Sequence, residues 1–172
     1  KNIWLHVWER VRDFLTRAGT IIAAMSVLVW FLQNFGMDLH MVADTADSIL
    51  AKFGSFIAPV FAPMGFGVWQ AAVALLTGLI AKEAVVSSMS LFYGFSLTDY
   101  AAAGAVMSAT FTPAAALAFL AFCALYTPCV AAISTIRREM GSGKWTALTL
   151  GWQLMVAWLV SFAVYHIAGL FL

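Results

Sequence analysis

Two short stretches carry the residues best suited to chemistry in this sequence, and the first is "ALYTPCVAA" at residues 124–132. Pro128 has no amide hydrogen, so in a helix the carbonyl of Ala124, four residues earlier, loses its hydrogen-bond partner. In a buried setting that oxygen must bind something else, such as the Thr127 hydroxyl, a water molecule or a cation. The next residue, Cys129, offers a sulfur that becomes a thiolate ligand when a metal displaces its proton.

An oxygen and a sulfur in one turn would suit a transition metal, because Mg²⁺ and Ca²⁺ take oxygen ligands alone. A structural alternative stays open, since membrane helices tolerate proline and a buried cysteine often serves as a small apolar residue. Cys123 is a weaker candidate ligand than Cys129. Six residues turn through about 600° of a regular helix, which places the two thiols on different sides.

The second stretch is "GLIAKEAVVSSMS" at residues 78–90, where Lys82 and Glu83 are adjacent in an otherwise uncharged segment. A charge at the centre of a bilayer costs about 2.5–3.5 kcal/mol, so such residues are functional candidates. Glu83, Ser87 and Ser90 share one face of a helix and would line a cation pathway, with Glu83 as a ligand or counter-charge. Lys82 lies about 100° away on the same helix. The alternative is that both charges are structural and are satisfied at an interface.

The composition indicates that lipid surrounds the elements that carry these residues. The chain has 172 residues, of which 63% are hydrophobic and 10% are charged, and its mean hydropathy is +0.93. Soluble domains carry about 25% charged residues. The net charge of +1, without a basic block, predicts no nucleic-acid partner. Two cysteines do not form a disulfide framework.

The charges fall in clusters that leave four uncharged runs, at residues 18–35, 53–81, 100–136 and 145–172. A helix needs about 20 apolar residues to cross the hydrocarbon core. We therefore predict an all-α, polytopic membrane helical bundle of about five spans. The expected spans are residues 18–35, 48–65, 69–93, 111–136 and 145–169. Pro59 and Pro63 make the second of these a distorted or re-entrant segment.

Residues 1–17 have apolar positions three and four apart and charges between them, which is typical of an amphipathic helix at a membrane interface. The alternative is a helix that packs on a soluble domain. We predict this interfacial helix at residues 1–17 and a transmembrane domain at residues 18–172. Arg and Lys near residue 17 and residues 137–144 would place those ends in the cytoplasm.

Enzymatic activity is not expected of this chain. The segment "GSGKW" at residues 141–145 lacks the first glycine and the final Ser or Thr of a phosphate loop. Cys129 as a catalytic nucleophile would need a base. His166 lies near the opposite end of the expected bundle.

Three segments together resemble a known family: "WERVRDFLTRAGTII", "APVFAPMGFGVWQAAVALLTGLIAKEAVVSSMSLFYG" and "FTPAAALAFLAFCALYTPCVAAISTIRREMGSGKW". In this order they are similar to the C-terminal membrane part of the FeoB-type ferrous iron transporters. The resemblance covers nearly the whole chain and implies the second of two Gate regions, related to nucleoside-permease gates. It implies that Fe²⁺ is the transported substrate and that Cys129 meets the ion during its passage. Pro128, Lys82 and Glu83 match the same motifs.

The resemblance also implies a setting and partners. It places the chain in the bacterial cytoplasmic (inner) membrane as a multi-pass fragment of a longer protein. The rest of that polypeptide would hold a first Gate region and a GTPase domain, which uses GTP and Mg²⁺. Small accessory iron-transport proteins and further copies of the protein are expected partners. The alternatives are a nucleoside or other permease of the gate superfamily and a non-transporting structural membrane subunit.

Overall fold

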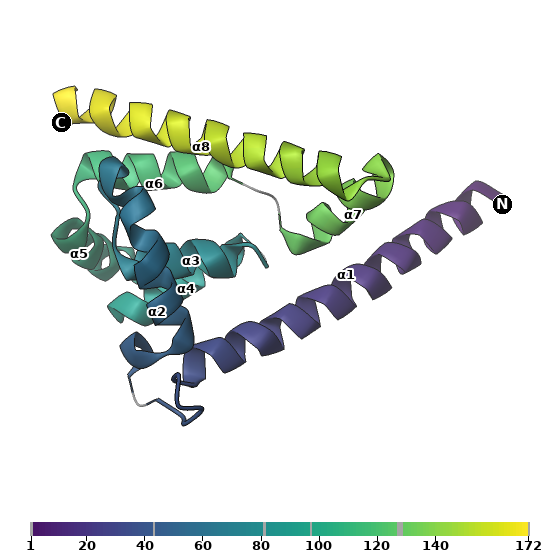
Figure 1. The fold of residues 1–172 in the computed structure, drawn as a ribbon, viewed down its shortest axis with the longest axis horizontal. Helices are drawn as coiled ribbons and strands as arrows, with labels where there is room; N and C mark the ends of the chain where they lie inside the picture. Colours follow the sequence, from purple (N-terminus) through teal and green to yellow (C-terminus); the bar gives the residue numbers. More distant parts are fainter. Residues whose placement is uncertain (1, 43, 81, 97, 127–128, 172) are drawn as a thin grey trace.

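The structure, a computed structural model, describes residues 2–42, 44–80, 82–96, 98–126 and 129–171. Most of the residues in these ranges lie in helices (Figure 1), which confirms the all-α prediction. In chain order they are α1 (Asn2–Asn34), the 3-10 helix η1 (Thr45–Asp47), α2 (Ile49–Ile57), the 3-10 helix η2 (Ala58–Met64), α3 (Trp69–Gly78), α4 (Glu83–Tyr93), α5 (Tyr100–Thr110), α6 (Pro113–Leu125), α7 (Val130–Met140) and α8 (Gly143–Phe171).

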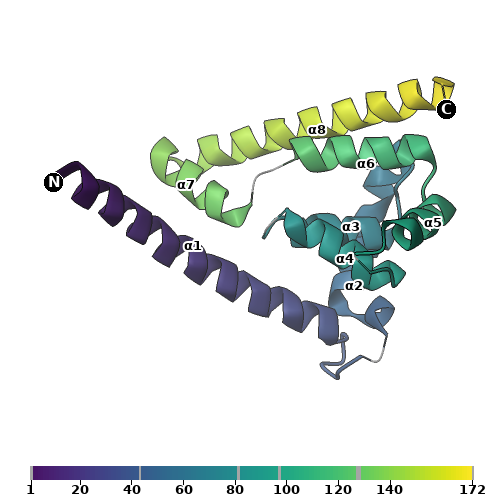
Figure 2. The same ribbon diagram turned by 180° about the vertical axis from the view of Figure 1, so that it is seen from behind.

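Helices α6 and α8 lie antiparallel along one side of the bundle, as both ribbon views show (Figures 1 and 2). Small residues are buried where the two helices pack, namely Ala114 and Ala118 in α6 and Ala157 and Ser161 in α8. In each pair the residues are four apart, so they share one face of their helix and let the two backbones approach closely. The Ser161 hydroxyl donates a hydrogen bond of 2.7 Å to the Ala118 carbonyl.

The core lies where η2, α3 and α6 meet, and aromatic rings fill it. Phe66 is fully buried, its ring stacks on Phe61 with 5.5 Å between centroids, and it meets Phe119 edge-on at 5.3 Å. The chain reaches Phe66 through Gly65, which has a φ of +79°. Glycine adopts this left-handed conformation without the strain that a side chain would add. The Trp158 indole donates to the Val60 carbonyl at 3.1 Å and so ties α8 to η2.

Two of the expected spans are each divided into separate helices. The expected helix at residues 69–93 ends at Gly78 and resumes at Glu83, so it forms α3 and α4. The turn between them begins with the Leu79 amide, which bonds to the Leu76 carbonyl three residues back, as in a 3-10 turn. The expected span at residues 111–136 ends at Leu125 and resumes at Val130, so it forms α6 and α7.

These breaks lower the number of spans that helix length supports. Among the described residues, α8 is the helix long and apolar enough to cross a membrane by itself. Two further pairs reach that length only across a bend of 103°, one comprising Ile49–Met64 and Trp69–Gly78, the other Ala101–Thr110 and Pro113–Leu125. The count is therefore one, or up to three if each bent pair is one span, with Ile22–Asn34 as a shorter apolar helix. The sequence-based prediction of about five spans is higher, because the length of an uncharged run does not reveal where a helix bends.

Helix α1 runs without a break from Asn2 to Asn34; it contacts α2 and α7, and its N-terminal end extends beyond the other helices (Figures 1 and 2). Its 33 residues span about 50 Å at 1.5 Å per residue. No helix end separates residues 2–17 from the apolar half that follows, so the two expected segments share one helix. The interfacial position of residues 1–17 remains a prediction.

Candidate functional site

The two helix breaks meet in the fold. The Val130 amide, at the start of α7, donates a hydrogen bond of 2.8 Å to the carbonyl of Leu79, which directly follows α3. Figure 2 shows the end of α3 facing the start of α7. Both stretches had drawn attention in the sequence, and the structure brings them together across 51 residues of chain. We refer to the described residues of this region, 78–80, 82, 123–126 and 129–130, as the break junction.

Tyr126 fills the centre of the break junction. Its ring stacks on Phe122 in α6 at 5.6 Å, and its hydroxyl donates to the Leu75 carbonyl of α3 at 3.4 Å. A Cβ atom on Gly78 would collide with the Tyr126 hydroxyl and with Val85. The glycine therefore lets the tyrosine lie across the end of α3, and this explains why a residue without a side chain stands there.

Lys82 makes the second set of contacts in the break junction. Its Nζ donates to the carbonyls of Cys123 and Ala124, each at 3.2 Å. It also reaches the Tyr126 carbonyl at 3.5 Å and lies 5.1 Å from the centroid of the Tyr126 ring. An ammonium has three hydrogens to donate, and the last carbonyls of a helix lack intrahelical partners and carry its partial negative charge. Lys82 thus caps the C-terminal end of α6.

The Ala124 carbonyl has a hydrogen-bond partner in the structure, the Lys82 ammonium. Its role as a metal ligand stays a prediction. We had expected a hydroxyl, a water molecule or a free cation to bind this oxygen. The group that binds this oxygen is a cation, the ammonium of Lys82 in the same chain. This contact could not be predicted from sequence spacing, since 42 residues separate Lys82 from Ala124.

The two cysteines lie on either side of this cap. Cys129 immediately precedes α7, where its side chain makes no capping hydrogen bond, and Cys123 belongs to α6. Both thiols are free and half-buried. Thr127 and Pro128, which we had also singled out, lie outside the described residues. Among the residues that are described, no three His, Cys, Asp or Glu side chains gather as metal ligands. A metal here would therefore rely on backbone oxygens beside a thiol.

The residues of the expected polar stripe on α4 have different partners. Glu83 is the exposed first residue of α4. The Ser87 hydroxyl donates to the Glu83 carbonyl at 3.5 Å, and the Ser90 hydroxyl donates to the carbonyl of Phe95 beyond the helix. Ser87 also lines a cavity of about 330 Å³ between α1 and α3–α4. The serines thus bond to nearby backbone oxygens, and the Glu83 carboxylate lies beside the Lys82 cap in sequence.

A buried pair that sequence reasoning missed joins α3 to α4. The Thr77 and Ser88 hydroxyls are 2.8 Å apart. Thr77 donates its own hydrogen to the Ala74 carbonyl at 2.8 Å, so Ser88 must be the donor between the two. Both residues line the same 330 Å³ cavity as Ser87. Ser88 stood outside the expected stripe, because the break after Gly78 changes which face of α4 meets α3.

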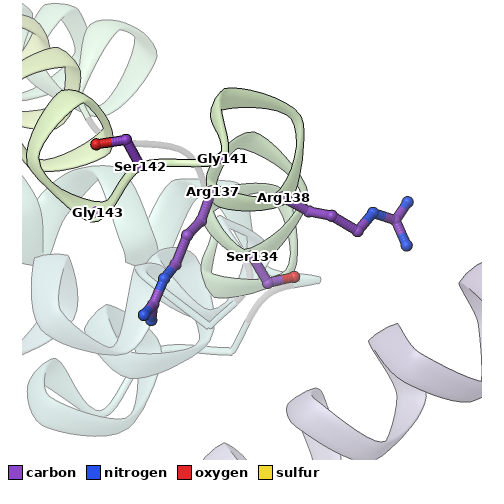
Figure 3. Close-up of a pocket in the computed structure, with 6 residues that line it drawn as sticks. All are labelled: Ser134, Arg137, Arg138, Gly141, Ser142 and Gly143. Atoms are coloured by element: carbon purple, nitrogen blue, oxygen red, sulfur yellow. The ribbon is translucent and has the colours of Figure 1, made fainter.

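A second cavity, of about 390 Å³, lies at the turn from α7 to α8, and Figure 3 shows the residues that line it. These are Ser134, Arg137, Arg138, Gly141, Ser142 and Gly143. The two arginine side chains point in different directions (Figure 3). The cavity coincides with a basic cluster that we expect on the cytoplasmic side.

Comparison with known proteins decides the family. Residues 15–143 match the Gate family, described as "Nucleoside recognition". The chain belongs to the Gate family. The matched residues include the whole break junction, from Gly78 to Val130. The Gate match and the apolar, bent helix pairs together identify a membrane protein.

Relatives of this Gate chain carry transporter names. It is 38% identical to the "Fe(2+) transporter FeoB" of Staphylococcus aureus (strain COL), over 99% of this chain and 25% of that protein. It is 37% identical to the protein of the same name from Methanocaldococcus jannaschii, over 96% of this chain and 25% of the relative. A fusion protein of Porphyromonas gingivalis, "Fe(2+) transport protein A/Fe(2+) transporter FeoB", is 29% identical over 99% of this chain and 26% of its own length.

The Gate chain spans about a quarter of the length of these relatives. This agrees with the resemblance found in the sequence, which covered the same motifs. No solved structure matches the chain.

Proposed function

We propose that this chain is the membrane-embedded part of a ferrous iron transporter and forms part of the path that Fe²⁺ takes across the bacterial cytoplasmic membrane, as a multi-pass domain. The observation that carries the proposal is the break junction, where two interrupted helices meet beside Cys129. Transporters place interrupted helices at their ion sites, because unwound backbone offers oxygens that a regular helix would occupy. The printed names of the relatives support iron as the cargo.

Cys129 is the residue that would meet the ion. Fe²⁺ is borderline in softness and accepts sulfur together with carbonyl and carboxylate oxygen. A half-buried thiol together with backbone carbonyls would make an incomplete shell. Such a shell suits transport, since an ion must leave the site as readily as it enters. Ala124, Thr127 and Pro128 belong to the path in this proposal, and Cys123 stands second to Cys129.

Glu83 supplies the negative charge of the path in this proposal. It is exposed at the start of α4, directly after Lys82, where an arriving cation would gain a counter-charge. Ser87 extends the polar surface from Glu83 into the cavity beside α1, while Ser90 closes the far end of α4. A single carboxylate attracts a divalent ion without enclosing it.

The remaining parts of the transporter lie elsewhere on the polypeptide in this proposal. They include a first Gate region and a GTPase domain that binds GTP with Mg²⁺ and controls passage of the ion. The chain's share of about 25% of its relatives' length leaves room for both. A small accessory iron-transport protein is a proposed partner, supported by the relative that is itself named as a fusion with Fe(2+) transport protein A. Association with further copies is proposed as well.

The test is Fe²⁺ uptake into vesicles by the full-length protein at limiting iron. Cys129→Ser should lower uptake about tenfold or more, because the loss of even an outer-shell partner of a metal ligand costs about 10–100-fold in affinity or activity. Cys123→Ser is the matched control and should have a smaller effect. Both variants should insert into the membrane as the native protein does. Uptake by Cys129→Ser at the native rate would remove Cys129 from the path. If Glu83→Ala also transported normally, a structural role of this chain would be favoured instead.

A second candidate, a nucleoside permease, is favoured by the printed description of the family, "Nucleoside recognition". Competition separates the two. In the same vesicles, an excess of Mn²⁺ or Co²⁺ should reduce iron uptake, and nucleosides should leave it unchanged. The reverse pattern would support the permease.

A further inference from the structure

Lys82 has a role that the proposed function does not use. Its ammonium occupies three carbonyl oxygens, those of Cys123, Ala124 and Tyr126. Backbone carbonyls of this kind take the place of a cation's hydration shell in selectivity filters. We propose that Lys82 is a tethered cation that keeps these oxygens filled, and that a transported cation must displace it. This gating role rests on the proposed function, whereas occupancy of a cation site by the ammonium does not.

Three carbonyl oxygens and an aromatic face surround the ammonium. Two oxygens lie at the same distance of 3.2 Å from Nζ and the third at 3.5 Å. The face of the Tyr126 ring adds a fourth attraction, 5.1 Å from its centroid. Oxygens from α6 and the residue after it thus converge on one point. Other carbonyls at the end of α6 have different partners, since the Phe122 carbonyl accepts from the Tyr126 amide and the Leu125 carbonyl accepts from Gln153.

The charge of Lys82 is not neutralised where it binds. Among the described residues its partners are backbone oxygens and an aromatic ring, and no carboxylate pairs with it. The ammonium therefore does two things at once. It fills the oxygens that would solvate an arriving cation, and it repels that cation.

The position of Lys82 allows the ammonium to leave. The residue lies in the break between α3 and α4, and its side chain is exposed. Lysine carries its charge on a flexible four-carbon stem. A shift of α4 relative to the end of α6 would thus withdraw the ammonium and leave the three oxygens to the cation. Glu83 follows directly in the chain and moves with it.

The first experiment measures cation binding without any transport. Lys82→Ala, made in the full-length protein, empties the oxygens, and thermal unfolding is followed in detergent with methylammonium chloride or tetramethylammonium chloride. Methylammonium donates hydrogen bonds, whereas tetramethylammonium has the same charge and cannot. We expect methylammonium to raise the Tm of Lys82→Ala by several degrees and to leave the native protein and the control Lys52→Ala unchanged. Equal Tm values in the two salts would overturn the cation site.

The second experiment measures the gate. The full-length protein is placed in liposomes that enclose a metal indicator, and Fe²⁺ entry is recorded without nucleotide. Lys82→Met keeps the length of the side chain and loses its charge, so passive entry should rise about tenfold. Lys82→Arg keeps the charge and should stay closed, and Lys52→Met should behave as the native protein. Lys82→Gln keeps hydrogen-bond donors for the carbonyls and loses the charge, so it should leak as Lys82→Met does. A closed Lys82→Gln would mean that the hydrogen-bonded cap, and not the charge, blocks entry.

The outcomes separate the two proposals. If the native protein takes up Fe²⁺ with GTP and Lys82→Met leaks no more than the native protein, the gating role is wrong and the proposed function stands. If no variant, including the native protein, moves Fe²⁺ under any condition, the proposed function fails. The unfolding experiment then decides whether Lys82 fills a cation site. Failure of Lys82→Ala to fold even in methylammonium would count against the site, because the added cation should restore it.

Discussion

The amide of Val130 donates its hydrogen to the carbonyl of Leu79 across 2.8 Å, and this bond fastens the start of α7 to the end of α3. Each of the two residues lies beside a break in what would otherwise be a longer helix. Because an unpaired amide or carbonyl costs several kcal/mol in hydrocarbon, breaking two helices at one place lets each satisfy the other. The junction beside Cys129 is thus stable without a continuous helix on either side.

Gly78→Ala should destabilise the protein by about 1–3 kcal/mol, the usual cost of an added methyl group in a closely packed site. The new Cβ would meet the Tyr126 hydroxyl and Val85. Chemical unfolding in detergent measures the effect. The control is Gly104→Ala, where a Cβ has open space in α5, and we expect it to stabilise by about 0.5–1 kcal/mol.

Tyr126→Phe should recover part of the stability lost in Gly78→Ala, because it removes the oxygen that the new methyl group would meet. Alone, Tyr126→Phe should cost less than about 1 kcal/mol, since its hydrogen bond to Leu75 is long at 3.4 Å. A double-mutant cycle by unfolding gives the coupling. Strict additivity of the two changes would contradict the contact that the structure shows.

Thr77→Val should destabilise the protein more than Ser88→Ala does. Ser88 is the donor of the bond between them, so Thr77→Val leaves a buried hydroxyl hydrogen without its acceptor, at a cost of about 1–3 kcal/mol. Ser88→Ala removes the donor and leaves only a lone pair of Thr77 unfilled. The double variant should lose less than the sum of the two single variants. The opposite order of the single effects would mean that the donor is assigned wrongly.

Ala157→Leu should separate α6 from α8 and cost about 1–3 kcal/mol or more. Ala157 is fully buried beside the core, and a larger side chain cannot enter while the backbones stay close. Ala147→Leu is the matched control, because Ala147 is an exposed residue of the same helix. Its thermal unfolding should resemble that of the native protein. Equal effects of the two changes would rule out close packing at Ala157.

The helix class and one of the breaks could be predicted from the sequence, because their causes are local. The apolar composition indicates that lipid surrounds the chain. In lipid a helix satisfies its backbone hydrogen bonds internally. Pro128 predicts an interruption of the helix, because it cannot donate to the Ala124 carbonyl. In the structure α6 ends at Leu125. The break after Gly78 has no comparable local cause. Tyr126, which follows α6 and lies 48 residues later in the chain, approaches Gly78 there, and sequence spacing does not report such contacts.

The partners within the site could not be predicted for the same reason. Lys82 and Glu83 attracted attention as charges in an apolar segment, and the structure shows where the Lys82 ammonium binds. Its acceptors are backbone oxygens, which every residue has, so no residue type marks them. The Thr77–Ser88 bond was likewise hidden, because the helix face that Ser88 occupies depends on the bend between α3 and α4.

The unbroken length of α1 has a mechanical consequence. Because a helix is stiff along its axis, the 33 residues of α1 would move together as a rigid lever. Tilting a lever about 50 Å long by about 10° displaces its tip by about 9 Å. Its Asn34 end adjoins the turn leading to α2, and its flank meets α7. A force on the Asn2 end would therefore be transmitted through α1 to α7, which begins beside Cys129. The position of the pivot would set whether the displacement at α7 is larger or smaller than that at Asn2.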